Sequence, residues 1–192
     1  MKRILFTLAA FALIGCQQAP VPDVLPPLSF ANQPKIRIAA TEIRVVENYV
    51  APARSPNIDH MFPVSPTAAI KQWANDRLQT AGSTGIMEIS IDDASVVEVP
   101  LPKTEGVRGF FTDDQSERYD GKIRVTMRLF DGQRGIAAAE GDVNVIRSRS
   151  INEKASLADR ERMFHSMTKE MMDQFNTQAE ARLRQYFSAF LR

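Results

Sequence analysis

Cysteine and histidine are nearly absent from this chain, which has one cysteine, Cys16, and two histidines, His60 and His165, among its 192 residues. A single cysteine cannot form a disulfide within the chain, so no disulfide framework supports the fold. Neither histidine has a second histidine or a cysteine close to it in sequence, whereas a stable zinc site needs three or four ligands at suitable spacings. The sequence therefore favours a domain that is held by its core, without a metal.

The chain also lacks the short motifs of two common classes of hydrolase, because it has no Gly-x-Ser-x-Gly and no His-Glu-x-x-His. A serine triad would have to use His60 or His165, and neither lies beside a recognisable nucleophile motif. Carboxylate pairs need no sequence motif, so an exported hydrolase that uses surface carboxylates is the alternative to a non-enzymatic binding protein. The acids available to it include Asp92, Asp93, Glu105 and Asp114.

No excess of one charge marks the chain, since 24 lysines and arginines face 23 aspartates and glutamates, for a formal net charge of +1. Such a balance provides no overall field that would draw the protein to nucleic acid. With 44% hydrophobic and 24% charged residues, the composition is that of a globular protein. We expect one domain, no cofactor and no nucleic-acid partner.

The N-terminal residues have the pattern of an export signal. Lys2 and Arg3 precede an apolar run from Ile4 to Ile14, which is too short to cross a bilayer as a helix but matches the apolar part of a secretory signal. The run ends in Leu13-Ile14-Gly15-Cys16, which resembles the lipobox of bacterial lipoproteins. The alternative is an ordinary signal peptide with a chance cysteine.

The resemblance to bacterial lipoproteins implies that residues 1–15 are a lipoprotein signal peptide and that Cys16 is the first residue of the mature protein. In that family the cysteine sulfur receives diacylglycerol and the new α-amine is acylated, for example with palmitate. Several acyl chains hold a protein firmly to a bilayer, because each buried methylene contributes about 0.8 kcal/mol. Gln17, rather than aspartate, follows the cysteine, which in the family favours the outer membrane, with the domain in the periplasm.

Proline is concentrated after Cys16, and its frequency there predicts extended backbone. We interpret residues 16–34 as the lipidated cysteine and a Pro-rich tether, and residues 35–192 as a single α+β domain. The prolines of the tether are Pro20, Pro22, Pro26, Pro27 and Pro34.

Alternation of apolar and polar residues predicts four strands in the domain. They cover 35–49 with a bend near Thr41, 85–101 with a possible bulge at Asp92-Asp93, 122–130, and 136 to about 147. In the third strand Ile123, Val125, Met127 and Leu129 share one face, and in the second Val97 and Val99 are expected to share the face of Met87, Ile89 and Ile91.

Two helices are predicted. Ser65-Pro66 is a helix start, and Gly82 is expected to end that helix. The longer helix is expected from near Ser156 almost to the terminus, with an apolar stripe that includes Phe175. The order of elements predicts a single antiparallel-rich four-stranded sheet with two helices packed on one face, an α+β two-layer sandwich.

Two surfaces are candidates for binding a partner. The irregular stretch from Pro102 to Asp120 contains Phe110-Phe111, which either project toward a partner or fold back over the core. The other candidate is the charged face of the sheet, where the predicted hairpin brings four side chains to one side. These are Arg124, Arg128, Glu140 and Asp142.

The order of these features looks like that of lipoproteins that assist lipid transport in the cell envelope. After the lipobox come Arg77-Leu78-Gln79, Glu117-Arg118-Tyr119, a strand ending in Arg147, and Arg182-Leu183. The pattern resembles the lipopolysaccharide-assembly lipoprotein of the outer-membrane translocon and, second, the auxiliary lipoproteins of ABC-type lipid transporters. The resemblance implies a non-enzymatic accessory protein that binds an envelope protein or lipid. The loops 50–63 and Phe110-Phe111 depart from both families.

Overall fold

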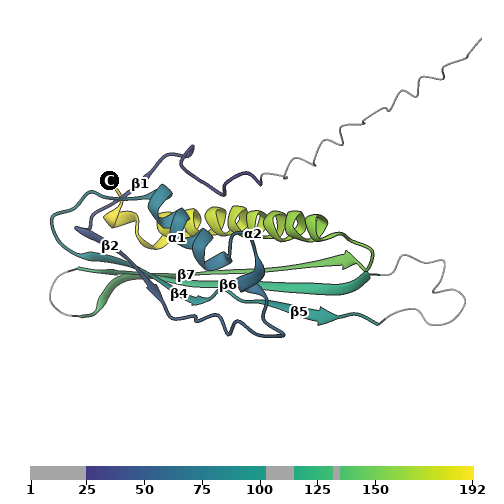
Figure 1. The fold of residues 1–192 in the computed structure, drawn as a ribbon. Helices are drawn as coiled ribbons and strands as arrows, with labels where there is room; N and C mark the ends of the chain where they lie inside the picture. Colours follow the sequence, from purple (N-terminus) through teal and green to yellow (C-terminus); the bar gives the residue numbers. More distant parts are fainter. Residues whose placement is uncertain (1–24, 103–114, 132–134) are drawn as a thin grey trace, which may run out of the picture.

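The computed structural model describes residues 25–102, 115–131 and 135–192, which form a sheet with helices lying along one of its faces (Figure 1). The helices are α1 (Pro66–Arg77) and α2 (Leu157–Tyr186), with short 3-10 turns at Asp59–Met61 and Ser188–Phe190. The strands are β1 (Ile36–Ile38), β2 (Glu42–Glu47), β3 (Leu78–Thr80), β4 (Ile86–Asp93), β5 (Val96–Pro100), β6 (Gln115–Phe130) and β7 (Ala137–Asn152).

The main sheet has five strands arranged around β6. Strand β7 pairs antiparallel with β6 along its whole length, and β4 and β5 follow one another along the opposite edge of β6. Strand β2 pairs parallel with β4. The prediction of a four-stranded, antiparallel-rich sheet is therefore wrong, because the sheet is mixed and has five strands, whereas an α+β fold with two helices is confirmed.

A bulge explains the additional strand. The register with β6 shifts between Ile91 and Asp93, so the predicted strand over 85–101 is divided into β4 and β5. The shift also moves each side chain after the bulge to the face of the sheet opposite the one that simple alternation predicts. After the bulge it is Val96 that is buried, whereas Val97 and Val99 are partly exposed, so the prediction that they share the face of Met87 is wrong.

The predicted strand over 35–49 is also divided, into β1 and β2, and β1 pairs parallel with β3 in a separate two-stranded sheet. Because β3 follows α1 directly, the helix ends at Arg77 and not at Gly82. Gly82 instead allows a close approach of two backbones. A Cβ at this position would lie 2.4 Å from the carbonyl carbon of Ala39.

The helix starts agree with the sequence. The Ser65 side chain accepts a hydrogen bond from the Ala68 N–H, and Pro66 occupies the first helical position. Ser156 and Asp159 form a reciprocal capping box at the start of α2. None of the helices in the described ranges is long and apolar enough to cross a membrane.

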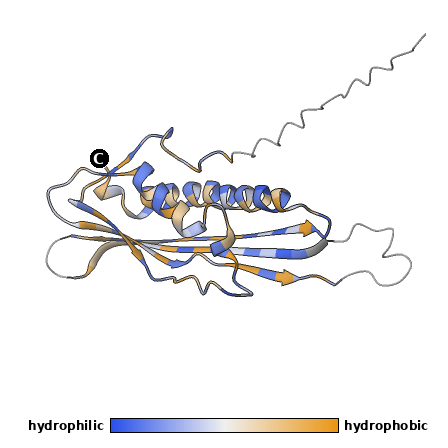
Figure 2. Ribbon diagram, viewed as in Figure 1, coloured by the Kyte–Doolittle hydropathy of each residue, from blue (hydrophilic) through white to orange (hydrophobic). Residues whose placement is uncertain are grey.

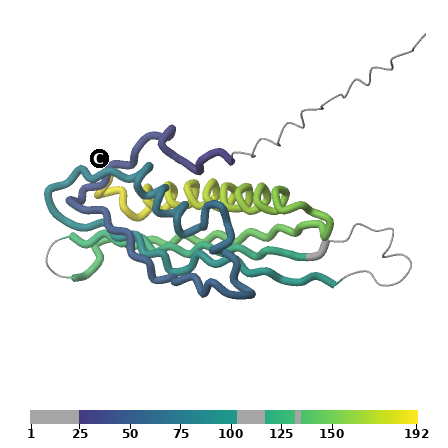
Figure 3. Tube along the Cα trace, in the orientation of Figure 1, coloured from purple at the N-terminus to yellow at the C-terminus, as the bar shows by residue number. Residues whose placement is uncertain are grey.

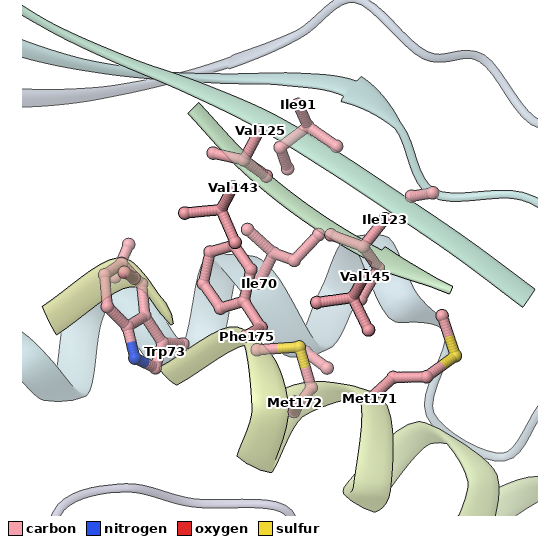
Figure 4. Close-up of a cluster of buried hydrophobic side chains, with 14 of the residues drawn as sticks. Ile70, Trp73, Ile91, Ile123, Val125, Val143, Val145, Met171, Met172 and Phe175 are labelled. Carbon is pink, nitrogen blue, oxygen red and sulfur yellow. The ribbon is translucent and has the colours of Figure 1, made fainter. Parts of the chain in front are cut away.

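The core is a single cluster of buried apolar side chains from the helices and the sheet. Hydrophobic and hydrophilic residues are interspersed along these elements (Figure 2). Trp73 of α1 and Phe175 of α2 are fully buried and meet edge to face, with ring centroids 4.9 Å apart. The inward residues of β6 and β7, including Val125 and Val143, pack beside them (Figure 4). The core position predicted for Phe175 is confirmed.

The end of the predicted tether packs on the domain. Phe30 is buried, and its N–H donates to Asp76 Oδ2 at 2.8 Å. The Nε2–H of His165, a buried residue that the sequence did not place in the core, donates to the Pro26 carbonyl at 2.7 Å. Residues 16–24, including Cys16, lie outside the described residues.

The irregular stretch expected from Pro102 to Asp120 is shorter than predicted, because residues 115–120 belong to β6. The rest of it, with Phe110 and Phe111, lies outside the described residues. Strand β7 likewise continues five residues beyond Arg147, to Asn152.

Candidate binding face on the open side of the sheet

Even-numbered residues of β6 and β7 lie on the side of the sheet that faces away from the helices, because odd-numbered residues such as Ile123 and Val145 are buried beneath them. In the register of the two strands, Arg128 lies opposite Glu140, and Asp142 lies opposite Thr126, the residue between Arg128 and Arg124. The structure therefore places all four predicted residues of the charged face on one surface, which we call the open face.

Two of these four residues form an ion pair. Arg128 Nε donates to Glu140 Oε2 at 2.7 Å, and this hydrogen bond raises the pKa of Arg128. Both side chains are one-third to one-half exposed, and exposed pairs of this kind contribute at most about 1 kcal/mol to stability. The pair therefore fixes side-chain positions on the surface more than it stabilises the fold.

The other two, Arg124 and Asp142, are exposed, and within the described ranges their side chains make no hydrogen bond or ion pair. The interaction at Asp142 involves its backbone, where the carbonyl accepts from Arg182 Nε at 3.3 Å. A guanidinium and a carboxylate that are already paired would have to exchange partners to bind a ligand. Among the described residues, Arg124 and Asp142 have no such side-chain partners to lose.

Further charged residues on the open face were not singled out from the sequence. Arg118 donates to Asp120, whose pKa is lowered chiefly by this hydrogen bond, and Ser148 also donates to Asp120, at 2.7 Å. Next to these, Ile146 of β7 is 70% exposed. The alternation of β6 and β7 contained the signal for these positions, since residues of equal parity share a face. The open face thus carries positive and negative side chains beside the exposed apolar side chain of Ile146.

The two carboxylates of the hydrolase alternative that the structure describes, Asp92 and Asp93, already form hydrogen bonds or an ion pair. Asp92 accepts from Thr126 Oγ1 at 2.6 Å and from Asn48 Nδ2 at 2.9 Å, and Asp93 lies 3.2 Å from Lys122 Nζ. Glu105 and Asp114 lie outside the described residues. Over the described ranges, no group of three histidines, cysteines or acids is placed to hold a metal ion, and His60 is exposed in a 3-10 turn.

Comparison with known proteins gives only distant similarity. No family model matches the chain, and no curated protein matches it either. Among solved structures, rare lipoprotein B from Shewanella oneidensis is 12% identical with a TM-score of 0.34, over 73% of this chain and 94% of that one. An uncharacterized lipoprotein B from Nitrosomonas europaea is 16% identical with a TM-score of 0.37, over 72% and 81%. Similarity at this level does not establish a shared function.

Proposed function

We propose that this chain is an outer-membrane lipoprotein, anchored through Cys16, whose periplasmic domain binds a protein or lipid of the cell envelope and has no enzymatic activity. The observation that carries the proposal is the sequence Leu13-Ile14-Gly15-Cys16 at the end of an apolar run that follows Lys2 and Arg3. In this position the cysteine is the residue that a lipoprotein needs. The role would be that of an accessory component in envelope assembly, such as the transport of lipid or lipopolysaccharide.

The open face supports a role in binding. It carries charges of both signs, and Arg124 and Asp142 have no side-chain partner among the described residues. Charged groups arranged in this way select a partner by electrostatic complementarity more than by strength of attraction. Asp92 and Asp93, the described acids of the hydrolase alternative, are held by neighbouring side chains and do not form an open pair.

The anchor is tested with Cys16→Ser, because the thioether requires the cysteine sulfur. We expect the variant to lose labelling by radioactive palmitate and to accumulate as uncleaved precursor or soluble protein. Gln18→Ser is the matched control, since it changes a nearby residue outside the lipobox and should keep both labelling and membrane fractionation. Mature Cys16→Ser protein in the outer-membrane fraction would show that the lipoprotein proposal is wrong.

The binding surface is tested by crosslinking and pull-down from native membranes. Arg124→Glu reverses an exposed charge on the open face, and Phe110→Ser with Phe111→Ser removes the apolar pair of the other candidate surface. We expect a binding-surface variant to keep its melting temperature and to recover less partner per folded molecule. If the double phenylalanine variant instead loses stability and recovers partner normally, the pair belongs to the core. If neither variant changes recovery, neither surface binds the partner.

A further inference from the structure

A pocket of about 290 Å³ lies where the segment before β1, the end of α2 and the last residues of the chain meet. Backbone hydrogen bonds hold these segments together. The Ala39 N–H donates to the Phe190 carbonyl at 2.7 Å, and the Arg192 N–H donates to the Arg37 carbonyl at 3.0 Å. The C-terminal segment accordingly runs beside the purple N-terminal part of the chain (Figure 3). The pocket is thus built from three distant parts of the sequence.

The lining of this pocket is strongly basic. Its ionisable residues are one acid, Glu180, and five cations, Lys35, Arg37, Arg77, Arg184 and Arg192. Five cations against one acid leave an excess of four, although the formal net charge of the whole chain is only +1. A chain-terminal carboxylate on Arg192 would reduce this excess by one. The positive charge is therefore local, and the pocket walls concentrate its field.

The acid in the pocket is already shared by two arginines. Arg77 is buried, and its guanidinium donates to Glu180 at 3.0 Å, to Asn176 Oδ1 at 3.1 Å and to the Pro34 carbonyl. Arg184 donates to the same Glu180 carboxylate. These contacts hold Arg77 and Glu180 in fixed positions in the lining of the pocket. Glu180 therefore does not neutralise the remaining cations.

Besides Arg77 and Arg184, which contact Glu180, the lining contains three cations, and two of these are exposed to solvent. Arg37 is exposed and makes no side-chain hydrogen bond or ion pair within the described part of the chain. Lys35 is exposed as well, and its Nζ donates to the Asn75 carbonyl at 3.2 Å. Apolar side chains, including Ile36 and Leu183, complete the lining. A site of this kind suits an anion that is joined to a less polar group.

We infer that this pocket binds a phosphate group, held by Arg37 and Lys35, which share the pocket lining with the Arg77–Glu180 pair. The guanidinium of an arginine presents parallel N–H donors that match two phosphate oxygens. The volume lies at the lower end of the range for ligand sites, so the pocket admits a phosphate or a headgroup and not a whole lipid. The phosphate belongs either to a free ion or ester or to a phospholipid headgroup.

The test is calorimetric titration of the full chain, purified in a non-ionic detergent, with two probes. Inorganic phosphate represents the free anion, and dihexanoylphosphatidylglycerol represents the headgroup. Arg37→Ala should weaken binding by about tenfold or more, because it removes a charge-assisted hydrogen bond. Arg54→Ala is the matched control, since Arg54 is another exposed arginine without a side-chain partner in the described residues, and it lies outside the pocket.

Each outcome decides the inference. Binding of both probes, weakened by Arg37→Ala and not by Arg54→Ala, supports a site for any phosphate group, and binding of the phospholipid alone supports a headgroup site. Lys35→Ala provides a second variant and should weaken the same probe. Failure of the unmodified chain to bind either probe, or equal weakening by Arg54→Ala, would overturn the inference. Because the phosphate titration does not depend on lipidation, its result is independent of the Cys16→Ser test.

Discussion

Replacing Phe175 by alanine tests the packing of the two helices on the sheet. Phe175 lies in the middle of α2 and is fully buried. Its ring meets the Trp73 ring edge to face, with an interplanar angle of 86°, so it joins α2 to α1 (Figure 4). On its other side lie the inward side chains of the sheet. The substitution would leave a cavity bordered by all three elements.

The expected cost follows from the size of the group that is removed. Truncation of a buried phenylalanine to alanine typically lowers the free energy of unfolding by about 3 to 5 kcal/mol, which includes the lost burial and the remaining cavity. The free energy of unfolding of a whole domain is only about 5 to 15 kcal/mol. For a domain of this length, each kcal/mol lost from the free energy of unfolding lowers the melting temperature by about 2 to 4 °C. A loss of about 4 kcal/mol should therefore lower the melting temperature by roughly 8 to 16 °C.

The measurement is urea and thermal unfolding followed by far-ultraviolet circular dichroism. Leu157→Ala is the control, because Leu157 also lies on α2 but is 72% exposed, and its removal should change the free energy of unfolding by no more than about 0.5 kcal/mol. A loss below about 1 kcal/mol for Phe175→Ala would refute the packing that the structure gives to α1 and α2.

Two further predictions use the same unfolding measurements. Gly82→Ala should lower the free energy of unfolding by about 1 to 3 kcal/mol, because the added Cβ would lie 2.5 Å from the Ala40 backbone nitrogen. An unchanged urea midpoint would contradict this prediction. Burial raises the pKa of Asp76, but hydrogen bonds from Phe30, Ser29 and Gln72 outweigh burial and lower it below the ordinary 3.8. The stabilisation from Asp76 is therefore complete above about pH 3.8 and is lost as the pH falls through the lower folded-state pKa. Asp76→Asn should make stability less dependent on pH in this acid range, and equal pH dependence in both proteins would contradict the prediction.

Local patterns in the sequence were sufficient for the features that depend on neighbouring residues. Ser65-Pro66 and Ser156 mark the two helix starts because a capping side chain bonds to an N–H only a few residues away. The side-chain period of two placed Arg124, Arg128, Glu140 and Asp142 on one face, because β6 and β7 lie close together in sequence, which limits their register. The open face could therefore be predicted, although the pairing of Arg128 with Glu140 required the structure.

Only the tertiary structure decided the features that join distant parts of the chain. The parallel pairing of β2 with β4 and of β1 with β3 depends on the path of α1 between them, and alternation within a strand does not encode its partner. The bulge after Ile91 exchanged the faces of Val96 and Val97, because one additional residue inverts the parity of all that follow. The basic pocket joins residues near 35, 77, 180 and 192, so no local pattern could contain it. Its charge is evident only when the fold brings those cations together around a single acid.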